Sequence, residues 1–113
     1  MNNYRVIYYT TESGTNPIKN FIDSLSPQQQ TKILRIFQYI TEYGLPAVLP
    51  HIKKVTGTSL WEIRILGKDN IRLFYVVIEK TDVLILHGCI KKTQKTKKKD
   101  ITLALDRYTK WKE

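Results

Sequence analysis

The sequence predicts a single α+β domain in which helices pack against a mainly antiparallel sheet. Four short segments are rich in β-branched and aromatic residues, as strands are, and three others repeat apolar residues every three or four positions, as amphipathic helices do. Their order is strand, helix, helix, three strands, helix. With 113 residues, 42% of them hydrophobic, the chain can form one core, so residues 1–113 are expected to be one domain.

The N-terminal part of the chain is predicted to hold a strand and two helices. Residues 4–10 are β-branched and aromatic and are expected to form the strand. Asn16 and Pro17 indicate a helix start, because Asn caps free N–H groups and proline suits the first helical position. Ser26 begins a second helix, with Gln29 completing a capping box. The apolar faces of the two helices consist of Ile18, Phe21, Ile22, Leu25, Ile33, Ile36, Phe37, Ile40 and Tyr43.

The rest of the chain is predicted to form a loop, three strands and a last helix. The second helix is expected to end at Gly44, a residue type that readily adopts the left-handed conformation found there. Residues 45–58 are predicted to be a loop interrupted by prolines. Strands follow at residues 60–66, 71–79 and 83–90. Because short connections join them, these strands should be antiparallel. Thr96 is expected to cap the last helix, whose apolar face consists of Ile101, Ala104, Leu105, Tyr108 and Trp111.

The net charge of +9 is concentrated at the C-terminus. Residues 91–113 carry nine basic and three acidic groups, and residues 91–99 alone contain six lysines. This asymmetry favours a polyanionic partner such as nucleic acid, a ribosome or an acidic protein, although a tail that only aids solubility is the alternative. Lysines in the first turn of the last helix oppose the helix dipole, while the free N–H groups there can bind anions. The two facts together favour a contact with a phosphate backbone.

Several classes of protein are excluded or disfavoured by the sequence. No run of about 18 apolar residues could span a membrane, and the first residues lack the pattern of a signal peptide. The single cysteine, Cys89, cannot form an internal disulfide, which suits a reducing cytoplasm. The sequence has no zinc-ligand spacing, phosphate-binding loop or dinucleotide fingerprint, so no metal or cofactor is expected. His87 and Cys89 are interpreted as packed side chains of a strand, with a catalytic role for His87 as the less favoured alternative.

The predicted hairpin between the second and third strands is the first candidate site. If residues 67–69 form its turn, Arg64 lies opposite Arg72 and Glu62 lies opposite Phe74. Like charges facing each other are unfavourable unless solvent or an anion compensates them. A bound phosphate would satisfy both arginines through forked hydrogen bonds. An ion pair with Glu62 would satisfy them equally well, and the two interpretations remain open.

Three segments resemble a known family. They are LWEIR at residues 60–64, IRLFY at 71–75 and LHGCIKKTQKT at 86–96. They are similar to the signature of the phage-derived Gp49-like, HigB-type branch of the RelE/ParE toxin superfamily. The first helix also fits, so the resemblance covers nearly the whole chain. Cys89 stands where the family commonly has Phe, and Lys97 stands where Pro is common.

The resemblance implies a RelE-like fold and the toxin of a type II toxin–antitoxin system. Active members enter the ribosomal A site and cleave mRNA without a metal, through the 2′-hydroxyl of the substrate. It also implies a HigA-like helix-turn-helix antitoxin, with operator DNA contacted only through the toxin–antitoxin complex, and a cytoplasmic location. ParE-like relatives share the fold but poison DNA gyrase, and an inactive nucleic-acid-binding relative is a third possibility. Fold alone cannot separate these functions.

Pattern and resemblance together give a set of candidate residues. The expected catalytic residues are Arg64, Arg72, Lys92 and Glu62. The cations would stabilise charge on the reacting phosphate, and Glu62, or a lysine with a depressed pKa, is the candidate base. The expected RNA-binding residues are Lys53, Lys54, Lys91, Lys95, Lys97, Lys98 and Lys99. Their contacts to phosphates would give an affinity that is sensitive to salt and independent of sequence.

Overall fold

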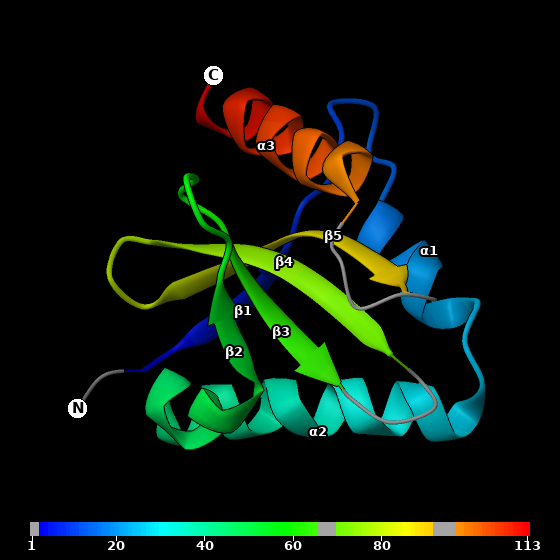
Figure 1. Ribbon diagram of the computed structural model, residues 1–113, viewed down its shortest axis with the longest axis vertical. Helices are drawn as coiled ribbons and strands as arrows, with labels where there is room; N and C mark the ends of the chain where they lie inside the picture. The colour runs from blue at the N-terminus through cyan, green and yellow to red at the C-terminus, as the bar shows by residue number, and fades with distance from the viewer. Residues whose placement is uncertain (1–2, 66–69, 92–96) are drawn as a thin grey trace.

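The protein consists of one mixed sheet enclosed between two helical layers (Figure 1). The computed structural model describes residues 3–65, 70–91 and 97–113. In chain order the elements are β1 (Arg5–Tyr8), α1 (Pro17–Asp23), α2 (Pro27–Tyr43), the 3₁₀ helix η1 (Leu45–His51), β2 (Ile52–Lys54), β3 (Trp61–Ile65), β4 (Ile71–Ile78), β5 (Asp82–Ile90) and α3 (Lys98–Lys112). The α+β class is therefore confirmed.

The five strands lie in the order β1-β5-β4-β3-β2, and the sheet is not purely antiparallel. β1 pairs in parallel with β5, whereas the other three pairings are antiparallel. The cause is the connection after β1. This strand is followed by two helices rather than by a tight turn, so its neighbour can run in the same direction. The sheet thus combines a hairpin-connected part with one crossover.

The two N-terminal helices begin where the sequence predicts. The Asn16 side chain caps α1 by accepting a hydrogen bond from the backbone N–H of Lys19 at 3.0 Å. Ser26 and Gln29 form the predicted capping box of α2, which ends at Gly44 with a φ of 82°. Both helices cover one face of the sheet. Their shared core with the sheet includes Ile18, Ile22, Ile33, Ile36, Phe37, Ile40, Ile63, Leu73, Tyr75, Val83 and Ile85.

The segment predicted as a loop at residues 45–58 contains two elements. The prolines do not prevent η1, a short helix with proline among its first positions. β2 follows directly and pairs with β3 at the edge of the sheet. β2 is only three residues long, which is too short to show the alternation typical of a strand. Its pairing with β3 is what defines it as a strand. The prediction of a loop was therefore wrong for residues 45–54, whereas residues 55–58 belong to no helix or strand.

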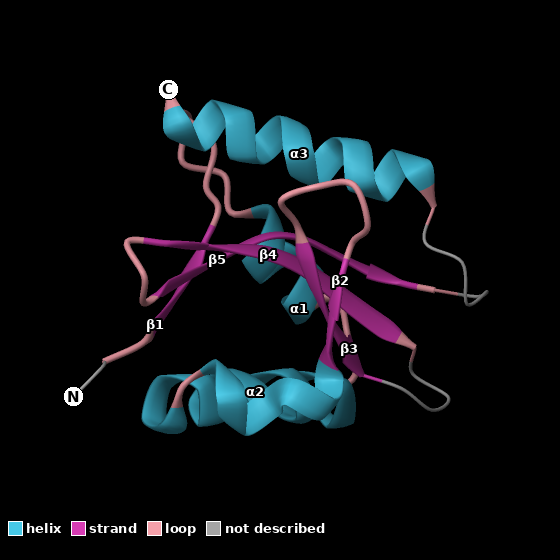
Figure 2. Ribbon diagram, turned by 60° about the vertical axis from the view of Figure 1, so that its left-hand side comes forward, coloured by secondary structure: helices cyan, strands magenta, loops and turns pink. Residues whose placement is uncertain are grey.

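α3 lies on the other face of the sheet, opposite α2 (Figure 2). It begins one residue later than predicted, because Lys97 occupies the N-cap position and Thr96 lies outside the described residues. Ala104 is fully buried against the sheet. The core on this side consists of Tyr9, Val55, Leu60, Phe74, Val76, Leu84, Leu86 and Ala104. Of the helices in the described ranges, none combines the length and apolar character needed to cross a membrane.

Candidate functional site

The face of the sheet toward α3 carries a row of charged side chains where β3 pairs with β4. Arg64 lies opposite Arg72 and Glu62 lies opposite Phe74, so the predicted register is confirmed. Because side chains alternate between the faces of a strand, these residues share the side on which Phe74 packs in the α3 core. The sheet thus brings two arginines and one carboxylate onto the same face.

Glu62 supplies the negative charge that the facing arginines need. Its Oε1 atom lies 3.2 Å from Nε of Arg72 and 3.6 Å from Nε of Arg64. Glu62 and Arg72 are buried, with 4% and 1% of their surface exposed, whereas the Arg64 side chain remains 28% exposed. The ion pairs with Glu62 that the sequence offered as one interpretation are therefore present, and the bound phosphate stays a prediction. Burial lowers the pKa of Arg72 most, the charge of Arg64 lowers it further, and Glu62 opposes both effects.

Lys91 lies in the interior rather than on the surface. It follows β5 directly, and its backbone N–H donates a hydrogen bond to the carbonyl of Asn70 at 2.8 Å. Only 5% of the residue is exposed. Burial is the main cause that lowers the pKa of Lys91. Arg72 acts in the same direction, while Glu62 acts against it. Sequence reasoning placed this lysine among surface RNA contacts and could not foresee its burial.

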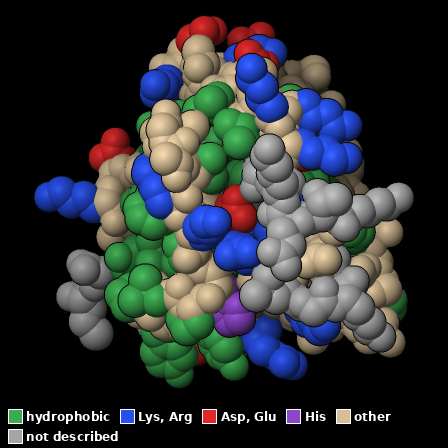
Figure 3. Space-filling view, in the orientation of Figure 1, with side chains coloured by type: hydrophobic (Ala, Val, Ile, Leu, Met, Phe, Trp, Pro, Cys, Tyr) green, Lys and Arg blue, Asp and Glu red, His purple; other side chains and the backbone are tan. Residues whose placement is uncertain are grey.

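The charged groups on this face are not balanced by hydrogen bonds within the described part of the chain. Three nitrogen atoms are buried without a hydrogen-bond partner in that part of the chain: Nε of Arg64, Nε of Arg72 and Nζ of Lys91. Both arginines are nevertheless close to Glu62. We call Arg64, Arg72, Lys91 and Glu62 the cationic cluster. Figure 3 shows acidic atoms near the middle of this side of the molecule, with Lys and Arg atoms beside them. Such unmatched donors favour an anionic ligand.

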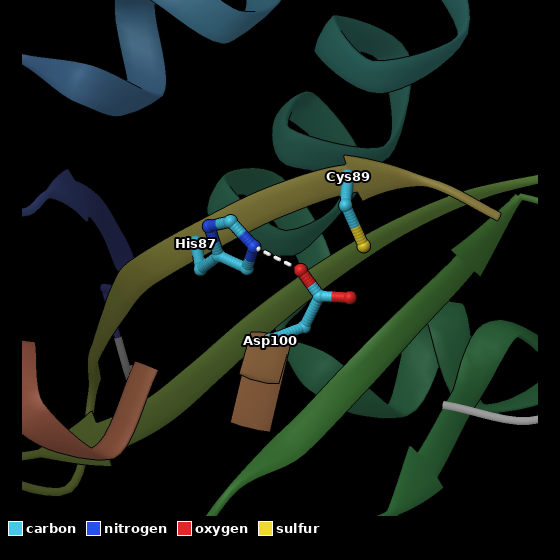
Figure 4. A group of neighbouring side chains, drawn as sticks. All are labelled: His87, Cys89 and Asp100. Atoms are coloured by element: carbon cyan, nitrogen blue, oxygen red, sulfur yellow. Dashed lines mark hydrogen bonds and ion pairs between the residues drawn. The ribbon is translucent and has the colours of Figure 1, made fainter. Parts of the chain in front are cut away.

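A second polar group links the sheet to the first turn of α3. His87 Nε2 and Asp100 Oδ1 lie 2.8 Å apart (Figure 4). The imidazole stacks on Phe74 with an angle of 11° between the rings. Burial is the main cause that lowers the pKa of His87, and the hydrogen bond to Asp100 opposes it. The neutral ring donates this bond to the carboxylate. His87 is thus packed, as expected, and also paired, which only the fold reveals.

His87, Cys89 and Asp100 together offer three donor atoms within 4.8 Å of one another. A zinc ion would require the thiolate form of cysteine. Burial is the main cause that raises the pKa of the Cys89 thiol, to about 11. Arg72 and Lys91 are near enough to act on the same thiol, so a divalent cation would lie beside two positive charges. We interpret His87 and Asp100 as a hydrogen-bonded pair that fixes α3.

The two lysines of β2 lie on opposite faces of the sheet. Lys53 pairs with Glu62, so its exposed side chain shares the face of the cationic cluster. Lys54 pairs with Trp61, and its Nζ lies 5.0 Å from the centre of the Trp61 ring. The structure therefore brings Lys53 to the candidate site and separates Lys54 from it.

The lysines around the start of α3 are exposed. Lys97 is the N-cap residue and makes no side-chain capping bond within the described residues, and Lys98 and Lys99 occupy the first turn. Two other predicted residues, Lys92 and Lys95, lie outside the described residues, as does the turn expected at 67–69. Asp100 was missed because an acidic residue in the first turn of a helix is an ordinary feature of sequence.

Comparison with known proteins finds one family. Residues 20–109 match the family described as Phage derived protein Gp49-like (DUF891). The match begins within α1 and extends into α3, and it includes β3, β4, β5 and the whole cationic cluster. No curated protein matches the chain.

Proposed function

The chain belongs to the phage-derived Gp49-like family, and from this premise we propose that it is a toxin that cleaves mRNA on the ribosome. The family is associated with the toxins of toxin–antitoxin systems. That association supports the assignment of this chain to the toxins and the existence of an antitoxin that binds it. The nuclease activity, the ribosomal A site as its place of action and a HigA-like antitoxin are our proposals. The same holds for a cytoplasmic location and for operator DNA bound only through the antitoxin complex.

The observation that carries the proposal is the cationic cluster. Arg64, Arg72 and Lys91 bring three positive charges to one Glu62 carboxylate, and a nitrogen of each cation lies buried without a hydrogen bond in the described structure. An RNA phosphate has the charge and the acceptor oxygens that these groups lack. A preorganised set of donors also stabilises the additional charge that develops on a reacting phosphate.

We infer a cleavage that uses the 2′-hydroxyl of the RNA as nucleophile. The 2′-oxygen bonds to phosphorus while the bond from phosphorus to the 5′-oxygen breaks, which leaves a 2′,3′-cyclic phosphate and a 5′-hydroxyl. Glu62 is the candidate base that accepts the 2′-hydroxyl proton, and the 5′-oxygen takes a proton from water. Arg64 and Arg72 stabilise the phosphorane, and Lys92 is retained as a third cation for this role.

Exposed lysines would hold the RNA on either side of the reacting phosphate. Lys53 lies on the face of the cationic cluster, and Lys97, Lys98 and Lys99 lie at the start of α3. Lys95 is kept as a further contact from its position in the sequence. Lys54, on the opposite face, would contact RNA or ribosome only outside the site. Phosphate contacts of this kind fix the register of the substrate without reading its bases.

The proposal is tested by regulated expression in a bacterial host with mapping of mRNA 5′-ends. Arg64→Gln is the main variant. Arg64 is the most exposed residue of the cationic cluster, so its substitution should leave the fold intact. Lys112→Met removes one exposed charge at the far end of α3 and is the control. We expect growth arrest with cuts in translated messages from the wild type and the control, and neither effect from Arg64→Gln.

Three results would contradict this proposal. Arrest without mRNA cuts would indicate a ParE-like toxin that acts on gyrase, and DNA damage signalling would then accompany arrest. The absence of arrest from a folded, expressed wild-type chain would indicate a regulatory protein that binds nucleic acid. Equal cutting by the wild type and Arg64→Gln would remove the cationic cluster from the mechanism.

A further inference from the structure

Two hollows flank η1 on the side of the sheet that faces away from the cationic cluster. η1 packs against α2 through Val48, and Figure 2 shows α2 across the sheet from α3. The basic hollow has a volume of about 450 Å³, and the residues that line it include Lys32, Arg35, Ile36, Tyr39, Val48 and His51. The apolar groove has a volume of about 220 Å³ and is lined by Leu45, Leu49, Ile52, Trp61, Tyr75 and Val77. A ligand that crosses η1 would contact both.

The apolar groove exposes large hydrophobic side chains to solvent. Leu49 is 61% exposed, Trp61 is 38% exposed and Val77 is 37% exposed. All the residues that line the groove are aliphatic or aromatic. Exposed apolar side chains that form one contiguous patch mark a site of interaction. The groove is smaller than the ~300–1,000 Å³ pockets that take whole small molecules, so it suits one or two side chains of a protein partner.

The basic hollow combines positive charge with an apolar floor. Its basic groups come from Lys32, Arg35 and His51, and its floor consists of buried aliphatic side chains. Among the residues that the structure describes, no aspartate or glutamate lines either hollow. Glu42, the one acidic residue of α2, accepts a hydrogen bond from Gln38 at 3.1 Å. The charge of the basic hollow is therefore complementary to that of an acidic ligand.

Lys54 extends the positive charge from the basic hollow to the apolar groove. Its Nζ lies 5.0 Å from the centre of the Trp61 ring, and Trp61 lines the groove. Cations thus border both hollows. A ligand that fits the whole surface must offer carboxylates next to apolar side chains, which is the pattern of an acidic amphipathic segment of a protein.

The same observations disfavour two other occupants. A second copy of this chain, bound through the same surface, would bring its own cations onto Arg35 and Lys54, and the net charge of +9 opposes self-association. A nucleic acid would pair its phosphates with these cations. It would leave Leu45, Leu49 and Ile52 of the groove without partners, because bases stack on aromatic planes.

We propose that η1 and its two hollows are the docking surface for an acidic amphipathic segment of a partner protein. The segment places apolar side chains in the groove and carboxylates beside Arg35, His51 and Lys54. The inference deepens the proposed function, on which it rests only for the identity of the partner as the antitoxin. Trp61 and the next residue, Glu62, point to opposite faces of β3, so the partner and an RNA can be bound at the same time.

The test is an NMR titration of the isotope-labelled protein with a designed peptide. The probe is a helical peptide of about 16 residues with leucines on one face and glutamates on the other. We expect the amide resonances of η1, Arg35 and Trp61 to shift, whereas those of Arg72 and Cys89 should not. A peptide of the same composition in scrambled order is the control for charge alone, and it should bind about tenfold more weakly because it lacks the apolar face.

Two variants at exposed positions test the contacts by fluorescence anisotropy with the same peptide. Leu49→Glu and Arg35→Glu should each weaken binding about tenfold, because one places a carboxylate in the apolar groove and the other removes a cation. Leu103→Glu and Lys112→Glu make the same changes of charge on the exposed side of α3 and should bind as the wild type does. No binding, equal binding of the scrambled peptide, shifts confined to the α3 side, or full affinity in Leu49→Glu would overturn the proposal. Shifts at η1 caused by an oligouridylate would also overturn it and would indicate a nucleic-acid surface.

The outcome is independent of whether the protein cleaves RNA. Peptide binding at η1, in a protein that makes no mRNA cuts, would support this surface and contradict the proposed function. mRNA cuts by a protein whose η1 does not bind the peptide would support the function and contradict this surface. The peptide titration uses neither ribosome nor mRNA, so the two failures are distinguishable.

Discussion

At the scale of single residues, Glu62 determines the electrostatics of the candidate site. One carboxylate lies within 3.6 Å of two arginine Nε atoms that face each other across β3 and β4. Without it, Arg64 and Arg72 would repel each other in a buried setting. The same carboxylate is the candidate base of the proposed reaction. Its structural and chemical roles can be separated by experiment.

Glu62→Gln is expected to lower the free energy of unfolding by about 3 kcal/mol, because it leaves buried Arg72 without its charge partner. Urea unfolding measures the effect. Phosphate should restore part of the loss, since it would supply the missing negative charge. Glu79→Gln, at an exposed glutamate in the turn after β4, is the control. An equal loss in both variants would show that the ion pair contributes nothing.

His87 is expected to link stability to pH. Burial, helped by Arg107, lowers its pKa below the ordinary value of 6.5, although Asp100 opposes the shift. The unfolded chain then takes up the proton more readily, so the contribution of His87 to stability is complete above pH 6.5 and is lost as pH falls through the lower folded pKa.

His87→Asn should therefore flatten the decline of unfolding free energy between about pH 7.5 and about pH 5. Urea unfolding at each pH is the measurement. His51→Asn, at the exposed histidine of η1, is the matched control. Equal flattening by the two variants would contradict the assignment of the pH dependence to the pair on α3.

At the scale of elements, α3 begins in a way that favours ligand contact over helix stability. Its N-cap is Lys97, which makes no side-chain capping bond among the described residues, and two more lysines follow in the first turn. Asp100 is the acidic residue of that turn, and it is bonded to His87. α3 is also attached to β5, because Arg107 of the helix donates a hydrogen bond to the Leu86 carbonyl of the strand at 2.9 Å.

Lys97→Ser should stabilise the protein by about 1 kcal/mol, because serine can accept a hydrogen bond from the free N–H groups of α3. The same change should weaken binding to a single-stranded RNA, since one cation is lost. Chemical unfolding and fluorescence anisotropy measure the two effects. Lys97→Met, which removes the charge without adding a cap, should weaken RNA binding alone. A stability gain in Lys97→Met as well would refute the capping argument.

The contact between α1 and β5 explains the glycine in the LHGCI segment. A Cβ atom on Gly88 would lie 2.5 Å from the Phe21 ring, so only glycine lets this ring pack on the strand. Gly88→Ala should cost about 1–3 kcal/mol of stability. Phe21→Leu together with Gly88→Ala should lose less than the sum of the single changes, as measured in a double-mutant cycle. Additive losses would show that the two residues do not compete for space.

At the scale of the whole molecule, the charge distribution should govern affinity for RNA. The net charge is +9, and Lys53 and the lysines at the start of α3 lie on the α3 side of the sheet. Each phosphate contact to a single strand contributes about 0.7 to the slope of log affinity against log salt. Lys98→Met with Lys99→Met should reduce that slope by about 1.4.

The matched control for this measurement is Lys110→Met with Lys112→Met, which removes the same charge from the other end of α3. The control should keep the wild-type slope, because local contacts rather than net charge set it. Equal slopes in the two double variants would mean that RNA responds only to the overall charge of the protein.

The features that the sequence alone determined are those set by neighbours along the chain. The caps at Asn16 and Ser26 are local hydrogen bonds, so the starts of α1 and α2 could be predicted. The pairing of Arg64 with Arg72 could also be predicted, because a short connection between two strands allows few registers. The family signature in β3 to β5 was likewise readable, and the Gp49-like match agrees with it.

Only the tertiary structure decided the features that depend on distant segments. β1 lies beside β5, β2 exists because β3 pairs with it, and Asp100 meets His87 from another element. The interior position of Lys91 belongs to this group. A lysine in a basic run resembles a surface residue in the sequence, because burial depends on which other segments pack around it and not on its neighbours along the chain.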